Sequence, residues 1–294
     1  MIRTPFSHNF LGGIRLIRVY AHLFRLPPAI MAAMAGCAAI YALNSAAQIH
    51  QYLLTAVILV CMNSAACAIN DYWDLDKDRI DHPERPLPSG RLKPQQAWRA
   101  AVILFTAALI AAIPLGVYPF ILVAVNTLLL WNYSHLLLYN GIFGNLIVSA
   151  VVASILFLSG LVAGSPFAMA YPTGLVFFYI WAKEIIWDVH DKKGDRAQGI
   201  VTIPNHWGDS TAFWIVWGLI IALMASIPVA FLLLPMKHPI LFAVFCSLML
   251  LTLGAATARF QRSRSASAYE GFIFWERLSV LFGVIGLLGT APPL

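Results

Sequence analysis

The feature that most constrains this chain is a series of nine apolar stretches, each long enough to cross a bilayer as a helix, which takes roughly 20 residues. Sixty per cent of the 294 residues are hydrophobic and 11% are charged, so a soluble domain with a polar surface is excluded. The pattern predicts an all-α, polytopic membrane protein of one domain, residues 1–294, with nine transmembrane helices. These are expected near residues 26–46, 51–70, 97–116, 117–133, 142–163, 167–187, 211–234, 238–258 and 271–290.

The basic residues predict the orientation, because cytoplasmic loops are enriched in Lys and Arg. Of the 19 basic residues, all but Lys237 lie on one side of the predicted spans, and the 13 acidic residues lie on that side too. We therefore expect the N-terminus and the charged loops to be cytoplasmic. The N-terminal segment 1–24 is expected to lie in the membrane interface, with residues 8–24 as an amphipathic helix.

The composition also argues against several other classes of protein and of binding site. The basic residues form no runs, so nucleic acid is not a predicted partner. The four cysteines lie within apolar stretches, with no histidine at ligand spacing, and predict neither a disulfide framework nor a zinc site. No predicted span carries a charge near its centre, which disfavours a transporter. The bilayer is the expected surroundings, and no feature points to a protein partner.

Two aspartate clusters follow the second and sixth predicted spans, in the expected cytoplasmic loops 71–94 and 188–210. Each has aspartates at positions i, i+3 and i+7, which share one face of a helix. Grouped carboxylates of this kind suit Mg²⁺, which commonly bridges protein carboxylates to substrate phosphates. The six predicted catalytic residues are Asp71, Asp74, Asp78, Asp188, Asp191 and Asp195.

The clusters are 188 − 71 = 117 residues apart, and each ends the second helix of a four-helix unit. An internal repeat of four helices is therefore expected, with the two clusters facing each other. Opposed carboxylates could hold Mg²⁺ around a diphosphate, with nearby cations completing the charge balance. These cations are Arg79, Arg85, Lys183, Lys192, Lys193 and Arg196. Beside an apolar groove, the arrangement suggests ionisation of an allylic diphosphate.

These motifs resemble the UbiA superfamily of intramembrane prenyltransferases. Asn70, Asp71, Asp74 and Asp78 match its NDxxDxxxD signature, and residues 85–90 read RPLPSG as in the family. Asp188, Asp191, Gly194 and Asp195 match its DxxDxxGD form, and residues 199–204 resemble its GIKTLP segment. The Gly144-Asn145 pair opening the fifth span also fits.

The resemblance implies a nine-helix bundle around a central cavity that binds a prenyl diphosphate through Mg²⁺. It implies that Asp71, Asp74, Asp188 and Asp191 are metal ligands, with Asp78 and Asp195 in support. It also implies that a further set binds substrate: Asn70, Arg79, Arg85, Tyr133, Asn145, Lys183, Lys192, Arg196 and, for an acidic acceptor, Arg25. The chain departs from the family at Leu138, where many members have a lysine after the Tyr-Ser pair that begins at Tyr133.

The predicted reaction is Mg²⁺-dependent transfer of a prenyl group to a small-molecule acceptor, an aromatic or quinone-precursor ring by first preference. A non-aromatic lipid acceptor, such as an isoprenoid glycerol phosphate, and intramolecular cyclisation of the donor remain open alternatives. A non-enzymatic cation carrier is a remote one.

Overall fold

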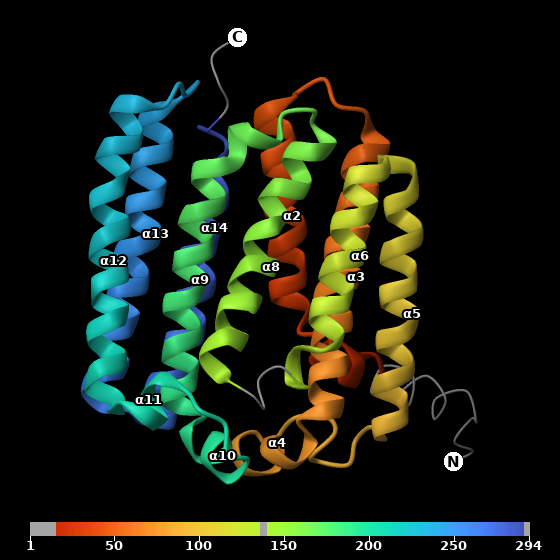
Figure 1. Cartoon of the computed structure of the whole chain (residues 1–294), viewed down its shortest axis with the longest axis vertical. Coiled ribbons are helices and arrows are strands. Elements are labelled where there is room, and N and C mark those ends of the chain that lie inside the picture. Colours follow the sequence, from red (N-terminus) through yellow and green to blue (C-terminus); the bar gives the residue numbers. More distant parts are fainter. Residues whose placement is uncertain (1–15, 136–139, 291–294) are drawn as a thin grey trace, which may run out of the picture.

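The computed structural model describes residues 16–135 and 140–290, and within these ranges every regular element is helical (Figure 1). Each of the nine predicted stretches overlaps one long helix. These are α2 (Leu26–Leu43), α3 (Ile49–Trp73), α5 (Pro94–Ala112), α6 (Val117–Trp131), α8 (Gly141–Val162), α9 (Ala170–His190), α12 (Gly208–Leu233), α13 (Pro239–Ser263) and α14 (Ala266–Leu287).

Six of the helices are long and apolar enough to cross a membrane: α2, α3, α5, α8, α12 and α13. The α5 span continues through the 3₁₀ turn η1 (Ile113–Leu115). Helix α6 is apolar but has 15 residues, while α9 and α14 contain charged residues that face the interior described below. The described part of the chain is thus all-helical and contains six candidate spans.

Local sequence sets the helix boundaries. Pro27 and Pro28 occupy the first turn of α2, where a proline nitrogen needs no hydrogen-bond partner. The Asn140 side chain accepts hydrogen bonds from two backbone amides at the start of α8. Gly116, with a φ of 111°, separates α5 and η1 from α6.

The segments expected as loops 71–94 and 188–210 are partly helical. They contain the ends of α3 and α9 and three short helices, α4 (Leu75–Asp81), α10 (Lys192–Ala197) and α11 (Ile203–His206). At the N-terminus, residues 16–23 are helical, while the beginning of the predicted amphipathic segment lies outside the described residues.

Two hydrophobic cores hold the bundle together. One joins α9, α12, α13 and α14 around residues such as Phe213 and Leu250. The other joins α2, α3, α5 and α6 around residues such as Ile58 and Phe105. Helix α8 packs against both α2 and α9, so it lies between the two halves (Figure 1).

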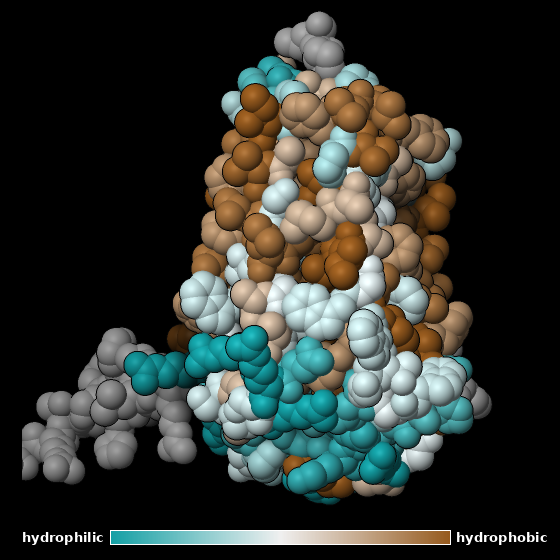
Figure 2. Space-filling view, turned by 90° about the vertical axis from the view of Figure 1, so that its left-hand side faces the viewer, coloured by the Kyte–Doolittle hydropathy of each residue, from teal (hydrophilic) through white to brown (hydrophobic). Residues whose placement is uncertain are grey.

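The face of the bundle in Figure 2 is apolar over most of its height. Large hydrophobic side chains are exposed on several helices, including Ile103 of α5 at 67% and Trp214 and Leu232 of α12 at 75% and 78%. Hydrophilic residues gather at the end that carries α4 and α10 (Figures 1 and 2). An apolar band of this size fits a protein surrounded by lipid.

Candidate functional site

Both aspartate motifs fold as a long helix, a one-residue break and a short helix. Asp71 lies in the last turn of α3, Asp74 is the residue between α3 and α4, and Asp78 lies in α4. The second motif repeats this arrangement. Asp188 lies in the last turn of α9, Asp191 separates α9 from α10, and Asp195 lies in α10.

All six aspartates line one cavity of about 980 Å³, which extends from the motif end into the bundle. Apolar residues from seven helices line its deeper part, among them Met31, Ile58, Val152, Leu175 and Val280. The volume is at the upper end of the roughly 300–1,000 Å³ typical of pockets for drug-sized ligands. The site therefore combines a charged mouth with a large apolar interior.

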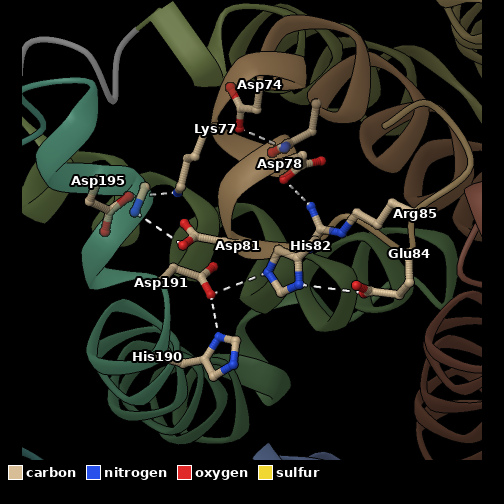
Figure 3. Close-up of polar contacts among 12 residues, drawn as sticks. Asp74, Lys77, Asp78, Asp81, His82, Glu84, Arg85, His190, Asp191 and Asp195 are labelled. Carbon is tan, nitrogen blue, oxygen red and sulfur yellow. Dashed lines mark hydrogen bonds and ion pairs between the residues drawn. The ribbon is translucent and has the colours of Figure 1, made fainter. Parts of the chain in front are cut away.

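Contacts between α4 and α10 bring the two motifs together (Figure 3). Lys77 Nζ lies 2.6 Å from Asp195 Oδ1, and the backbone amide of Gly194 donates a 3.1 Å hydrogen bond to Asp81 Oδ1. A Cβ atom on residue 194 would lie 1.9 Å from the other Asp81 carboxylate oxygen, so this close approach needs glycine.

Two arginines neutralise the first motif. Arg25 Nη2 lies 2.9 Å from Asp71 Oδ1, and Arg85 Nη1 lies 2.6 Å from Asp78 Oδ1 and 3.8 Å from Asp71 Oδ1. Arg25 adopts a left-handed backbone conformation with a φ of 47°, which costs a non-glycine residue roughly 1–2 kcal/mol. This turn separates the helix at 16–23 from α2 and places the guanidinium at Asp71, which is 1% exposed.

Two amides orient one aspartate in each motif. Asn70 donates a 2.7 Å hydrogen bond to Asp74 Oδ2, and Asn145, from α8, donates a 2.7 Å hydrogen bond to Asp188 Oδ2. Tyr133 also lines the cavity. Leu138, the predicted departure from the family pattern, lies outside the described residues.

Three of the predicted substrate-binding cations are directed elsewhere and do not line the cavity. Arg79 pairs with Asp76 on the surface, where its side chain is 60% exposed. Lys192 pairs with Asp209, 2.6 Å away, and Arg196 donates a hydrogen bond to Asn205. The short helices turn these side chains outward, a direction that spacing along the chain does not reveal.

Conversely, Lys77 was not among the predicted site residues. It follows Asp74 by three residues and precedes Asp78, so the helical spacing that selected the aspartates also placed this cation beside them.

Two carboxylates that the sequence analysis did not include, Glu184 and Glu276, line the cavity near the predicted cation Lys183. Lys183 pairs with Glu184, 3.3 Å away, lies over the Trp187 ring and is near Glu276. Glu276 is buried ten residues from the start of α14 and eleven from its end. Glu276 is therefore central in α14, whereas in the predicted stretch, which begins at residue 271, it lies near one end. Helix α14 is not among the six candidate spans.

Burial changes the acidity of the carboxyl groups outside the spans. It raises the pKa of Asp195 to about 6, although the ammonium group of Lys77 opposes this shift. Burial also raises the pKa of Asp74 above its usual value. One oxygen each of Asp78, Asp81 and Asp195 is buried without a hydrogen-bond partner. Such oxygens are suited to bind a hard cation.

Comparison with known proteins shows which family the chain belongs to. Residues 29–278 match the model of the UbiA prenyltransferase family. The digeranylgeranylglyceryl phosphate synthase of Sulfolobus acidocaldarius is 32% identical over 174 residues, which cover 59% of this chain and 63% of that enzyme. The synthase of the same name from Methanocaldococcus jannaschii is 26% identical over 262 residues, covering 87% of this chain and 91% of the relative.

The fold has solved counterparts. A UbiA homologue from Archaeoglobus fulgidus, bound to GPP and Mg²⁺, superimposes with a TM-score of 0.70 at 17% identity. The match covers 91% of this chain and 99% of the homologue.

Proposed function

Because the chain belongs to the UbiA prenyltransferase family, we propose that it transfers a prenyl group from an allylic polyprenyl diphosphate to an acceptor within the membrane. Pyrophosphate is the second product. The observation that carries the proposal is the joining of two aspartate motifs across the mouth of a large apolar cavity. The mouth suits the diphosphate, and the interior suits the hydrocarbon.

The donor set fits Mg²⁺. Asp71, Asp74, Asp188 and Asp191 are the proposed ligands, and the unpartnered oxygens of nearby carboxylates add coordination capacity. The Archaeoglobus fulgidus homologue binds GPP together with Mg²⁺, which supports the same assignment here. When bound, Mg²⁺ supplies positive charge that stabilises the departing diphosphate.

The proposed diphosphate contacts from the chain itself are Arg25, Lys77 and Arg85. Each is paired with an aspartate and lines the cavity, so its remaining N–H groups can donate to phosphate oxygens. Lys183 lies beyond Asp188, nearer the apolar interior, where it can contact the acceptor.

The chemical step breaks the bond between the allylic C1 and the diphosphate oxygen, and the electron pair leaves with pyrophosphate. The acceptor supplies the electron pair for the new bond to C1, and its proton passes to a site carboxylate or to pyrophosphate. Apolar walls exclude water from the allylic cation, and the faces of Tyr133, Trp187 and Tyr269 provide cation–π stabilisation.

For the acceptor, we propose a glycerophosphate lipid. Both synthases named above are called after a product with two geranylgeranyl groups on glyceryl phosphate, which favours this acceptor over the aromatic ring that the sequence analysis placed first. An acceptor that carries its own long chain also suits the cavity volume.

We further propose that all nine long helices span the membrane as two related four-helix units followed by α14. The equivalent positions of the aspartate motifs, after α3 and after α9, support the repeat. The concentration of charge at the motif end supports a cytoplasmic site, since the opposite end carries the basic residue Lys237 alone among those in the described ranges.

The acceptor is tested by competition. Purified protein in nanodiscs receives geranylgeranyl diphosphate, Mg²⁺ and equal amounts of geranylgeranylglyceryl phosphate and a hydroxybenzoate, and the products are analysed by mass. We expect the prenylated glycerophosphate to dominate. Prenylated hydroxybenzoate as the main product would refute the acceptor assignment, and a terpene hydrocarbon formed without either acceptor would indicate a cyclase.

A further inference from the structure

Two histidines and an aspartate form a compact cluster where α4 and α9 end (Figure 3). His82, His190 and Asp191 each offer one ligand atom, and all three atoms lie within 4.8 Å of one another. The histidines are 190 − 82 = 108 residues apart, so no ligand spacing in the sequence indicates the cluster. The α4–α10 contact creates it.

The His82 ring has a nitrogen atom that makes no hydrogen bond. The residue His82 is 8% exposed, and its Nε2 atom is buried without a hydrogen-bond partner. Nε2 lies 3.2 Å from Asp191 Oδ1, a distance that brings the two groups together without hydrogen-bond geometry. The other ring nitrogen, Nδ1, faces the Glu84 carboxylate at 3.7 Å. At this distance the exposed carboxylate makes an ion-pair contact with the ring but no hydrogen bond.

His190 is held in place by stacking. Its ring lies on that of Tyr269, with centroids 3.5 Å apart and planes at 9°, and it is also stacked with the ring of His82 at 5.6 Å. Its Nδ1 atom lies 2.6 Å from Asp191 Oδ1. Two ligands bound at about 2.0–2.1 Å to one ion are separated by roughly 3.0–3.4 Å. The observed 2.6 and 3.2 Å are close to that range, so small movements would admit an ion.

We propose that His82, His190 and Asp191 bind one divalent transition-metal ion of the Zn²⁺ and Co²⁺ class at the mouth of the cavity. Imidazole nitrogen favours such ions over Mg²⁺, which prefers oxygen ligands. Asp191, one of the proposed Mg²⁺ ligands, lies at the border between this nitrogen-containing site and the all-oxygen carboxylates. Three protein ligands leave a coordination position for water or a phosphate oxygen.

The alternative is a metal-free cluster in which Asp191 is hydrogen-bonded to the two histidines. This alternative explains the position of His190 but not that of His82. It would use Asp191 Oδ1 as an acceptor for His190, but it leaves Nε2 of His82 in an ion-pair contact with the same oxygen, at 3.2 Å and without hydrogen-bond geometry. A metal ion would use all three ligand atoms, including Nε2 of His82.

The test measures metal binding, so its outcome is separate from that of the prenyl-transfer proposal. Full-length protein is stripped with a chelator and titrated with Co²⁺ in excess Mg²⁺, which occupies the oxygen sites. We expect one equivalent of Co²⁺ with the visible absorption of nitrogen coordination. His82→Ala and His190→Ala should each weaken binding about 10-fold or more, and His206→Ala, which removes an exposed imidazole at the same end, should not.

Glu84→Gln provides a second variant that should fold normally, because the Glu84 side chain is 66% exposed. It removes a negative charge 3.7 Å from Nδ1 of His82 and should weaken Co²⁺ binding about 2- to 3-fold. Circular dichroism and melting in chelator establish that each variant is folded. Co²⁺ that is displaced by Mg²⁺, or that binds equally well to folded His82→Ala and Glu84→Gln variants, would overturn the proposal.

Discussion

The contact between Lys77 and Asp195 joins the two aspartate motifs, and Lys77→Met tests its importance. The side chains are 15% and 2% exposed, so the substitution leaves a buried carboxylate without its cation. Methionine retains most of the lysine stem, which limits the change to the charge. Breaking a buried ion pair by removing one partner typically costs about 3–5 kcal/mol.

The pKa of Asp195 indicates how this cost depends on pH. Burial raises that pKa from 3.8 to about 6 even with Lys77 present, so the folded protein loses stability as pH rises toward 6 and little more above it. Removing Lys77 raises the pKa further. The variant therefore continues to lose stability above pH 6, by at most about 1.4 kcal/mol per pH unit, and a loss of about 3 kcal/mol at pH 8 would match the low end of the cost of breaking a buried pair. Below pH 6, Asp195 is protonated in both proteins and the difference shrinks.

The assay is thermal unfolding of detergent-solubilised protein in chelator, at pH 8 and pH 5. At about 2–4 °C per kcal/mol, we expect Lys77→Met to lower Tm by roughly 6–12 °C at pH 8 and by less than half as much at pH 5. Lys192→Met is the matched control, because it breaks the more exposed pair with Asp209 and should cost at most about 1 kcal/mol. Equal Tm shifts for the two variants, or a shift independent of pH, would refute this reasoning.

Three further predictions concern prenyl transfer, diphosphate binding and Mg²⁺ affinity. Asp71→Asn and Asp188→Asn should each lower prenyl transfer about 100-fold or more while the protein remains folded in size-exclusion chromatography, since each removes charge from one motif; normal turnover in both would contradict the two-motif mechanism. Arg85→Gln should weaken diphosphate binding about 10-fold or more, whereas Arg79→Gln, outside the cavity, should leave it unchanged in a donor titration. Mg²⁺ affinity should rise between pH 5 and pH 7 as Asp195 loses its proton, and calorimetry showing constant affinity would count against a carboxylate site.

Helix positions were largely predictable because apolar length and helix-breaking residues are local properties. The stretch at residues 26–46 corresponds to α2, whose start is fixed by Arg25 and the two prolines that follow. The structure of the motif segments was less predictable. The spacing of Asp71, Asp74 and Asp78 suggests one continuous helical face, yet the helix breaks at Asp74, and the three carboxylates share a cavity because α4 turns toward α10.

Which residues line the cavity is decided partly by contacts between segments that are distant in the sequence. Spacing and family motifs identified all six aspartates and the amide partner Asn145, because these lie within recognisable patterns. They gave no means of separating Arg85, which lines the cavity, from Arg79, which faces solvent. The pairing of His82 with Asp191 is a property of the docked helices and has no local signal.

The most direct test of prenyl transfer is the simultaneous measurement of pyrophosphate release and product mass in nanodiscs, using a series of allylic diphosphates with and without the glycerophosphate acceptor. The account predicts Mg²⁺-dependent release that requires the acceptor, with one pyrophosphate for each product whose mass equals acceptor plus prenyl group minus the displaced proton. Absence of release from every donor in the presence of Mg²⁺ and acceptor would contradict the central claim.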